Sequence, residues 1–376
     1  MVKKNILVFA HESSLNGASH SLLTILIGLK SEYNFLVIIP DKGLMEAPLF
    51  ENNINYKILN IPRCSYFNFK SITDHLKRIY SYYRVKKTIL MSLNLICNTF
   101  KPDIIYTNTS VISLGFDLSK KINKPHVWHI REYGDTDFNI CYIPFRKAII
   151  NKIKKSKKSV FTTHLLKKHW LGEMKENSSI IYNGVFDSVN LIKKAQLNRV
   201  TRIGIVGLIM ENKGQFEAIL ILNLIVKQNK NVHLFIYGDI YNKEYYKLLE
   251  NLIIEKSLNK KVYFMGYVEN NEIYQNIDIL LSSSKNEGFG RTIIEAMSYG
   301  IPVVARNSGG PTEIIENGLD GFLYDTVKQG SDRITNLIMN SKLYFDISLR
   351  SKYSARSKFS KREYLKSINS IFKEAI

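Results

Sequence analysis

Short apolar runs alternate with helix-length segments along the whole 376-residue chain. Thirteen of these runs are rich in aliphatic and aromatic residues, as expected for buried strands. Strands that alternate with helices predict parallel sheets covered by helices on both faces, which is an α/β fold. The runs in the first half are Ile6–Ala10, Phe35–Ile39, Tyr56–Leu59, Ile104–Thr107, His126–Ile130, Ser159–Thr162 and Ser179–Tyr182. Those in the second half are Ile203–Val206, Val232–Tyr237, Val262–Met265, Ile277–Leu281, Pro302–Ala305 and Phe322–Tyr324.

Thirteen strands are too many for one doubly wound domain, which usually carries about six. Two sheets therefore fit better than one. The break is predicted near Asn183-Gly184-Val185, because Asn-Gly is a turn signal and the segment after it is polar without a strong period. We predict a first domain over residues 1–183 and a second over 184–357, with a C-terminal helix of about 358–376 that packs back on the first domain. Glycines and polar residues follow the strands of both halves, and this distribution predicts a cleft between the two domains.

Composition places the chain among ordinary globular proteins, with 45% hydrophobic and 23% charged residues. No run approaches the roughly 18 apolar residues of a membrane span. The run Ile6–Ala10 is too short for a signal peptide. Cys64, Cys97 and Cys141 are far apart and lack metal-ligand spacing. These features predict a reduced, cytoplasmic protein.

The formal net charge of +20 is the main anomaly of the composition. Either a solvated, lysine-rich surface explains it, or an anionic partner does: a membrane surface, a polyanionic acceptor or nucleic acid. Nucleic acid is the weakest of these, because no recognition motif accompanies the charge. Cations interleave with tyrosines over Lys77–Lys87, and a second basic run covers Lys152–Lys158. These segments are either charged helix faces or a docking site for a peripheral protein at the inner face of a membrane.

The segment Asn286–Glu295 places two carboxylates, Glu287 and Glu295, eight positions apart around a Gly-Phe-Gly turn. An apolar run precedes it and a helix-like run, Thr292–Tyr299, follows, so the pattern predicts strand, glycine turn and helix. The free amides of a helix N-terminus suit a phosphate. Carboxylates repel a phosphate but accept hydrogen bonds from a diol. Phosphate together with a polyol indicates a nucleotide sugar.

These residues and their surroundings resemble the retaining glycosyltransferases of family 4, which have the GT-B fold of two Rossmann-like domains facing across a cleft. The hallmark of the family, two glutamates separated by seven residues, is matched by Glu287 and Glu295. Further matching pieces are Gly207 with Lys213-Gly214, Gly238-Asp239, Gly266-Tyr267-Val268, Asp278, Gly300–Ala305, Gly309–Glu313 and Asn317–Leu323. The first half matches more loosely, through Gly17-Ala18, His129–Glu132 and Ile181–Val185.

The resemblance implies roles for the matched residues. Glu287 and His129 are expected at the donor sugar, with Glu287 near the reacting centre, and Glu295 is expected at the ribose hydroxyls. The remaining donor-binding residues are expected at the diphosphate or sugar: Gly17, Lys213, Gly288, Phe289 and Gly290. Many members of the family carry an arginine directly after the glycine matched by Gly207, but this chain has Leu208. Arg291 and Arg131 are the candidates to replace the missing phosphate-binding cation.

Structural explanations stay open beside these roles. His129 could be a satisfied core histidine, and Arg131 could simply pair with Glu132. Glu295 could pair only with a neighbouring lysine. Gly309-Gly310 could be no more than a tight turn instead of a phosphate cradle.

The prediction is a retaining, hexosyltransferase-type enzyme that moves a hexose-type sugar from a nucleotide sugar to a glycan or lipid-linked acceptor. The family and the Lys/Asn/Ile-rich composition suggest bacterial cell-surface polysaccharide biosynthesis. No cofactor is expected, and no metal, because no aspartate-rich metal motif is evident. Two other functions stay open. One is another GT-B nucleotide-sugar enzyme, such as an epimerase or a hydrolase. The other is a non-catalytic nucleotide-sugar-binding partner subunit, which only Leu208 favours.

Overall fold

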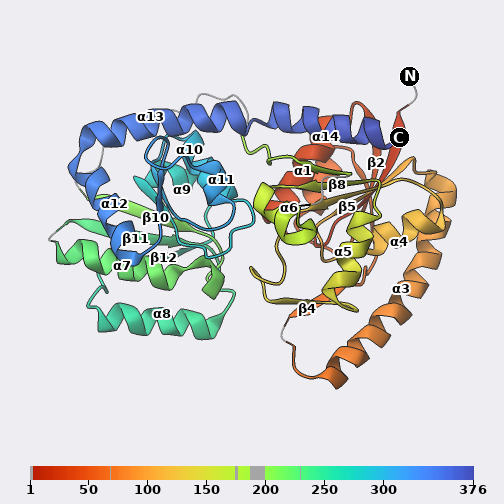
Figure 1. The fold of residues 1–376 in the computed structure, drawn as a ribbon, viewed down its shortest axis with the longest axis horizontal. Coiled ribbons are helices and arrows are strands. Elements are labelled where there is room, and N and C mark those ends of the chain that lie inside the picture. The colour runs from red at the N-terminus through yellow and green to blue at the C-terminus, as the bar shows by residue number, and fades with distance from the viewer. Residues whose placement is uncertain (1–2, 68, 174–176, 187–199, 229) are drawn as a thin grey trace. The chain divides into compact units, whose positions relative to one another are not determined.

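The computed structural model describes residues 3–67, 69–173, 177–186, 200–228 and 230–376. The chain forms two compact units (Figure 1). Unit 1 comprises Met1–Gly184 together with Lys361–Ile376, and unit 2 comprises Val185–Ser360. The C-terminal helix therefore belongs to unit 1, although it follows unit 2 in the sequence.

Unit 1 is built on a seven-stranded parallel sheet in the order β3-β2-β1-β5-β6-β8-β9. Its strands are β1 (Lys4–Phe9), β2 (Tyr33–Ile39), β3 (Asn55–Ile58), β5 (Ile104–Asn108), β6 (His126–Ile130), β8 (Lys158–Phe161) and β9 (Ser178–Ile180). Its helices are α1 (Gly17–Leu29), α2 (Glu46–Glu51), α3 (Ile72–Phe100), α4 (Leu114–Lys121), α5 (Arg146–Lys154), α6 (His164–Leu171) and α14 (Lys361–Ala375). The strand order reverses between β1 and β5, which is where ligands bind in sheets of this kind.

Unit 2 is built on a six-stranded parallel sheet in the order β12-β11-β10-β13-β14-β15. Its strands are β10 (Thr201–Val206), β11 (Val232–Tyr237), β12 (Val262–Gly266), β13 (Ile279–Ser282), β14 (Val303–Arg306) and β15 (Phe322–Tyr324). Its helices are α7 (Gln215–Lys227), α8 (Lys243–Glu255), α9 (Asn270–Asn276), α10 (Arg291–Ser298), α11 (Pro311–Ile314), α12 (Val327–Met339) and α13 (Ser341–Lys358). The strand order reverses between β10 and β13.

The predicted α/β fold with two parallel sheets is confirmed, and each of the thirteen predicted runs contributes a strand. The run from Ile277 joins the sheet two residues later than predicted, at Ile279. Asp278, just before this strand, instead holds the start of β10: its carboxylate accepts a hydrogen bond of 2.8 Å from the amide of Arg202. The sequence did not predict β4 (Ser65–Phe67) and β7 (Ile140–Tyr142), a short antiparallel pair. Three residues are too few to show an alternating pattern.

Alternating side chains of β1 pack apolar residues on both faces of the unit 1 sheet. Ile6 and Val8 join a core with residues of α1 and α14. Leu7 and Phe9 point the other way and join a core with residues of α3 and α4. Helices therefore cover both faces of the sheet (Figure 1). Among the described residues, no helix combines the length and hydropathy needed to cross a bilayer.

His126 begins β6 and is buried in unit 1. Its Nε2 lies 2.8 Å from the hydroxyl of Thr107 and its Nδ1 lies 2.9 Å from the hydroxyl of Ser156. Burial, together with the nearby charges of Lys120 and Lys152, lowers the pKa of His126 to about 3. The imidazole is therefore neutral in the folded chain at pH 7 and remains so well below the pH at which a free histidine takes up a proton.

This buried histidine makes stability depend on pH. Below about pH 6.5 His126 takes up a proton in the unfolded chain but not in the folded chain. The contribution of His126 to the free energy of unfolding is therefore fully present above about pH 6.5 and is lost as pH falls. Between pH 7 and 5 we expect the native chain to lose about 2 kcal/mol more free energy of unfolding than the His126→Gln variant, whose amide does not titrate. Urea unfolding at both pH values measures this difference, and parallel pH curves for the two chains would contradict it.

Candidate functional site

Three loops of unit 2 leave the carboxyl ends of adjacent strands. The Lys213 loop (residues 207–214) follows β10, the Glu287 loop (residues 283–290) follows β13, and the Gly309 loop (residues 307–310) follows β14. Because β10, β13 and β14 are neighbours in the sheet, the three loops meet at one edge. This is the edge where ligands of open parallel sheets bind.

Gly214 holds the Lys213 loop against the Glu287 loop. Its φ is +73°, and an added Cβ would lie 2.1 Å from the carbonyl oxygen of Ser283. Only glycine permits this approach of two backbones. The approach places the Nζ of Lys213 at 2.9 Å from Oε2 of Glu287. Lys213 and Glu287, 74 positions apart in sequence, are thus joined as an ion pair.

Gly309 and Gly310 hold the Gly309 loop equally close to the backbone of the Glu287 loop. An added Cβ would lie 2.4 Å from the carbonyl oxygen of Glu287 at Gly309, and 2.1 Å from that of Phe289 at Gly310. The amide of Gly310 donates to the carbonyl oxygen of Glu287 at 2.7 Å. This amide is already used within the protein, so of the two explanations for the glycine pair, loop packing is the one that accounts for Gly310.

The carboxylate of Glu287 is ionised at neutral pH. Burial opposes its ionisation, but the charge and hydrogen bond of Lys213 outweigh burial, with help from the amide of Phe289 and the hydroxyl of Ser284. Together they hold the pKa of Glu287 below its ordinary value. The amide of Phe289, predicted to serve a ligand, therefore serves Glu287, and its ring is buried against Phe359.

Glu295 lies on α10 and is buried. Its Oε1 accepts a hydrogen bond of 2.8 Å from Nε of Arg291, and its Oε2 accepts one of 2.9 Å from the hydroxyl of Tyr274. The explanation by a neighbouring lysine is therefore wrong, since the cation beside it is an arginine one helical turn away. A carboxylate oxygen can accept two hydrogen bonds, so the arrangement is compatible with hydroxyl ligands.

Gly290 starts α10 with φ +102°, a conformation that favours glycine. Together with the buried Gly288 it makes the predicted turn, and the predicted sequence of strand, glycine turn and helix is confirmed. The amides of Ile293 and Ile294 donate to the carbonyl oxygen of Gly290, whereas those of Arg291 and Thr292 lie ahead of the first turn of hydrogen bonds within the helix. The N-terminus of α10 thus lies beside Glu287 and suits an anion.

Arg291 is the better of the two candidates for the missing phosphate-binding cation. Leu208 is 43% exposed and brings no charge to the Lys213 loop. The Nη1 of Arg291 is buried and has no hydrogen-bond partner within the described part of the chain. Arg291 belongs to the first turn of α10, so a donor group is available beside the N-terminus of that helix.

Arg131, in unit 1, makes hydrogen bonds with four side chains of its own unit. Its Nε donates to Oδ1 of Asn108 at 2.5 Å and its Nη1 to Oδ1 of Asn183 at 2.6 Å. Its Nη2 lies 3.0 Å from the hydroxyl of Tyr364 on α14. Arg131 does not pair with Glu132, because Glu132 instead accepts from the amide and the hydroxyl of Ser110. The guanidinium of Arg131 therefore joins β5, the chain after β9 and the C-terminal helix.

His129 lies on β6, buried beside Arg131. Its Nδ1 lies 2.8 Å from the hydroxyl of Tyr106 and 3.3 Å from Nη2 of Arg131. Burial lowers the pKa of His129 well below its ordinary value, and Arg131 lowers it further. Because a guanidinium only donates, Nδ1 accepts and the proton resides on Nε2. Nε2 has no hydrogen-bond partner among the described residues, so His129 is not a fully satisfied core histidine.

Gly17 is the first residue of α1 and is exposed. The side chain of Asn16 caps this helix by accepting from the amides of Ala18 and Ser19, at 3.0 and 3.1 Å. Asn108, which holds Arg131, also donates to the carbonyl oxygen of Ala18 at 3.4 Å. Unit 1 thus brings Gly17, His129 and Arg131 together near its own switch point between β1 and β5.

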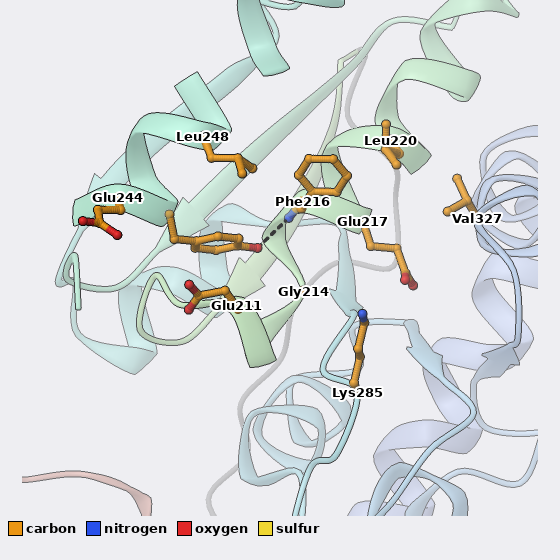
Figure 2. Close-up of a pocket in the computed structure, with 10 residues that line it drawn as sticks. Glu211, Gly214, Phe216, Glu217, Leu220, Glu244, Leu248, Lys285 and Val327 are labelled. Carbon is orange, nitrogen blue, oxygen red and sulfur yellow. Dashed lines mark hydrogen bonds between the residues drawn. The ribbon is translucent and has the colours of Figure 1, made fainter. Parts of the chain in front are cut away.

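A hollow of about 600 Å³ opens beside the Lys213 loop (Figure 2). It is lined by Glu211, Gly214, Phe216, Glu217, Leu220, Glu244, Tyr245, Leu248, Lys285 and Val327. These residues include none of the predicted donor-binding side chains, and three of them are glutamates. Since like charges repel, the hollow is a poor place for a diphosphate, and we place the candidate site at the three loops instead.

Sequence reasoning missed the residues that hold the predicted ones in place: Tyr274, Ser284, Asn108, Asn183 and Tyr364. Tyr274 meets Glu295 across 21 positions, and Tyr364 meets Arg131 across 233. Asn183 carried a signal as part of the predicted break between domains. Ser284 lies three positions before Glu287, among the polar residues that follow a predicted strand. The other three carried no signal, because nothing in a single sequence marks contacts between distant segments.

Residues 190–356 match the model of the family of group 1 glycosyl transferases. Protein CapJ of Staphylococcus aureus is 23% identical over 322 residues, which are 82% of this chain and 80% of CapJ. A sucrose synthase of Melioribacter roseus is 46% identical over 70 residues, which are 18% of this chain but only 9% of that enzyme. The last match therefore concerns a small part of a much longer protein.

Two solved structures of low sequence identity share the fold. HepE of Anabaena, in complex with UDP and glucose, is 22% identical with a TM-score of 0.78, over 98% of this chain and 99% of that one. A mutant of S. aureus TarM, in complex with Fondaparinux, alpha-GlcNAc-glycerol and UDP, is 16% identical with a TM-score of 0.78, over 98% and 99%. These similarities confirm the predicted GT-B fold.

The close approach of the Gly309 loop is testable with two glycines of similar φ, +67° at Gly309 and +84° at Gly318. An added Cβ meets nothing within 4 Å at Gly318 but meets the backbone of Glu287 at Gly309. We expect Gly318→Ala to cost about 1–2 kcal/mol for the backbone conformation alone, and Gly309→Ala about 1–3 kcal/mol more. Urea unfolding of both variants measures the difference, and equal losses would contradict the close packing of the Gly309 loop on Glu287.

Proposed function

We propose that this protein is a retaining, nucleotide-sugar-dependent enzyme of family 4. The match of residues 190–356 to the group 1 glycosyl transferase model, in a chain of GT-B fold, supports this proposal. It moves a hexose-type sugar to a glycan or lipid-linked acceptor. One observation carries the proposal: Lys213–Glu287 and Arg291–Glu295, two ion pairs, stand beside the N-terminus of α10. This set offers cations for a diphosphate and carboxylates for sugar hydroxyls.

Transfer of the sugar breaks the bond between its C1 and a diphosphate oxygen, so negative charge grows on the leaving group. Preorganised donors stabilise such charge without further rearrangement. Lys213 and Nη1 of Arg291 supply cationic donors, and the first amides of α10 supply neutral ones. In this proposal Arg291 does the work of the arginine that Leu208 replaces, and the diphosphate needs no resident metal.

Glu287 then acts as an acceptor of hydrogen bonds and not as an acid. The lowered pKa supports this, since the group carries no proton to donate at neutral pH. Its carboxylate accepts from the donor-sugar hydroxyls, while Glu295 accepts from the ribose hydroxyls. The acceptor hydroxyl gives its proton to the leaving phosphate, on the same face of the sugar, which retains the configuration at C1.

His129 contributes a neutral N–H donor to the sugar. The support is its tautomer, with Nδ1 accepting from Arg131 and Nε2 carrying the proton. An imidazole that donates from Nε2 suits a sugar hydroxyl or ring oxygen as acceptor. Gly17, exposed at the N-terminus of α1, leaves room for a close approach of the diphosphate.

The similar proteins guide the choice of donor and setting. HepE and TarM were solved with UDP, which makes UDP-sugars the first donors to test. TarM also held alpha-GlcNAc-glycerol, which supports a glycan-type acceptor. We place the reaction in bacterial cell-surface polysaccharide biosynthesis, on the cytoplasmic side of the membrane.

Donor binding is tested by the melting temperature of the chain in a panel of nucleotide sugars. A ligand at a hundred times its dissociation constant stabilises by about 2.7 kcal/mol, which corresponds to a shift of about 5 °C or more for a unit of this size. We expect Glu295→Gln to reduce the shift and Glu316→Gln, at an exposed carboxylate of the same unit, to leave it unchanged. If no nucleotide sugar shifts the native chain, the donor site is wrong.

Turnover tests the chemistry. We expect Glu287→Gln to keep most of the donor-induced shift but to lose about a hundredfold or more of the transfer rate, as for other groups that act in the transition state. Donor consumption and product formation by the native chain, the variant and Glu316→Gln are compared, with and without EDTA. Activity that vanishes in EDTA would contradict the metal-free proposal. Donor binding by the native chain without turnover for any acceptor would favour the non-catalytic partner subunit.

A further inference from the structure

The longest helix of unit 1, α3, presents large apolar side chains to solvent. Ile72, Leu76, Tyr80, Met91 and Leu95 are between 58% and 72% exposed. Their spacing of three to four residues, or of multiples of it, places them on one face of the helix. The helix has 29 residues and so spans about 43 Å. Figure 1 shows it at the outer side of the unit, with its N-terminal end extending away from the sheet.

This exposed face is a fixed part of the fold, because the opposite face is anchored. Tyr82 and Leu93 are buried, and the hydroxyl of Tyr82 lies 3.0 Å from that of Ser113. Lys86 forms an ion pair of 2.7 Å with Asp117 on α4, and Lys152 on α5 forms one of 2.9 Å with the same carboxylate. The helix therefore cannot roll to bury its apolar face without breaking these contacts.

Cations share the apolar face. Lys77, Arg84 and Lys87 are exposed and lie among the apolar positions, and Asp74 is the one acidic residue in the sequence of the helix. The rest of unit 1 is also positively charged. Unit 1 has 31 lysines and arginines against 15 aspartates and glutamates, a formal charge of +16, whereas unit 2 has 22 against 18, or +4. The charge excess of the chain is thus concentrated in the unit that carries α3.

A second copy of the chain is a poor partner for this face. A two-fold interface brings identical patches together, so the exposed cations of one α3 would meet those of the other. Like charges brought together in this way are destabilising. A partner with an apolar interior and an anionic surface satisfies both the apolar and the cationic side chains. An anionic lipid bilayer has these two properties, and tyrosine and lysine are favourable at its interface.

We propose that the outward face of α3 docks on the surface of an anionic bilayer, with the helix lying in the interface. The apolar side chains enter the boundary of the acyl region, and Lys77, Arg84 and Lys87 meet the lipid phosphates. The proposal concerns binding to lipid and does not depend on the proposed reaction. In this proposal the basic segment Lys77–Lys87 binds the membrane surface. Lys152, the first residue of the second basic segment, instead helps to hold α3 in place through its ion pair with Asp117.

Flotation with vesicles tests the proposal on the full chain. One set contains phosphatidylglycerol and phosphatidylcholine, and the other contains phosphatidylcholine alone. We expect binding to the anionic set at low salt and its loss at high salt, because screening removes the attraction of exposed charges. The double variant Lys77→Gln/Lys87→Gln should bind about thirtyfold more weakly, at about fivefold for each lysine. The triple variant Ile72→Ser/Leu76→Ser/Tyr80→Ser should lose about tenfold or more.

Matched controls separate this face from general charge and general exposure. Lys243→Gln/Lys247→Gln removes the same charge from exposed positions of α8 in unit 2 and should leave binding nearly unchanged. Phe50→Ser removes an aromatic ring that is 77% exposed on α2 of unit 1 and should do the same. Because the changed side chains are all exposed, we expect each variant to fold. Circular dichroism and the melting temperature check this.

Three results would overturn the proposal. The first is an absence of binding to anionic vesicles at low salt. The second is equal binding by the native chain and the two α3 variants. The third comes from light scattering without lipid: a native dimer that the α3 variants convert to a monomer would assign the face to a contact between copies.

Discussion

Close contact between the backbones of three loops is the constraint on which the rest of unit 2 depends. At Gly214, Gly309 and Gly310 a side chain of any kind would meet backbone atoms at less than 2.5 Å. Two of these three residues also have positive φ, which adds a second reason for glycine. Because the loops touch, Lys213 and Glu287 meet, although 74 positions separate them. The glycines thus create the charge pair by letting the loops pack closely.

Unit 1 uses a buried cation in a comparable way. The guanidinium of Arg131 would be costly to bury without partners. Asn108, Asn183 and Tyr364 provide those partners, and each comes from a different segment of the unit. The arginine therefore fixes where the chain leaves unit 1 at Asn183 and where it returns in α14. The same side chain sets the tautomer of His129, so one residue links the packing of the unit to the hydrogen-bonding character of its histidine.

The sequence predicted the architecture well because the pattern of buried parallel strands is local. Each apolar run predicts a strand by itself, and even the short run Phe322–Tyr324 forms one. The candidate site was harder to predict from the sequence. Glu287 and Glu295 were predicted as site residues from their spacing, but their partners were not predicted. Arg291 lies one turn from Glu295, and Tyr274 reaches Glu295 from another helix. The alternative in which Arg131 pairs with Glu132 is wrong, because the two side chains, just past the end of β6, bind different partners: Arg131 donates to Asn108 and Asn183, whereas Glu132 accepts from Ser110. Polar contacts between distant segments are a property of the fold and leave no trace in a single sequence.

Pairing each carboxylate with a nearby cation leaves the candidate site close to electrically neutral, whereas the chain as a whole is strongly positive. The exposed charges and the paired charges of the site act over different distances. Exposed lysines attract an anion over distances comparable to the Debye length, so they govern how often an anionic reactant meets the protein. Lys213 and Arg291 act only at contact and so govern how long the reactant stays. Ionic strength should therefore change the rate of encounter far more than the rate of departure, and selectivity between anions is left to the neutral site.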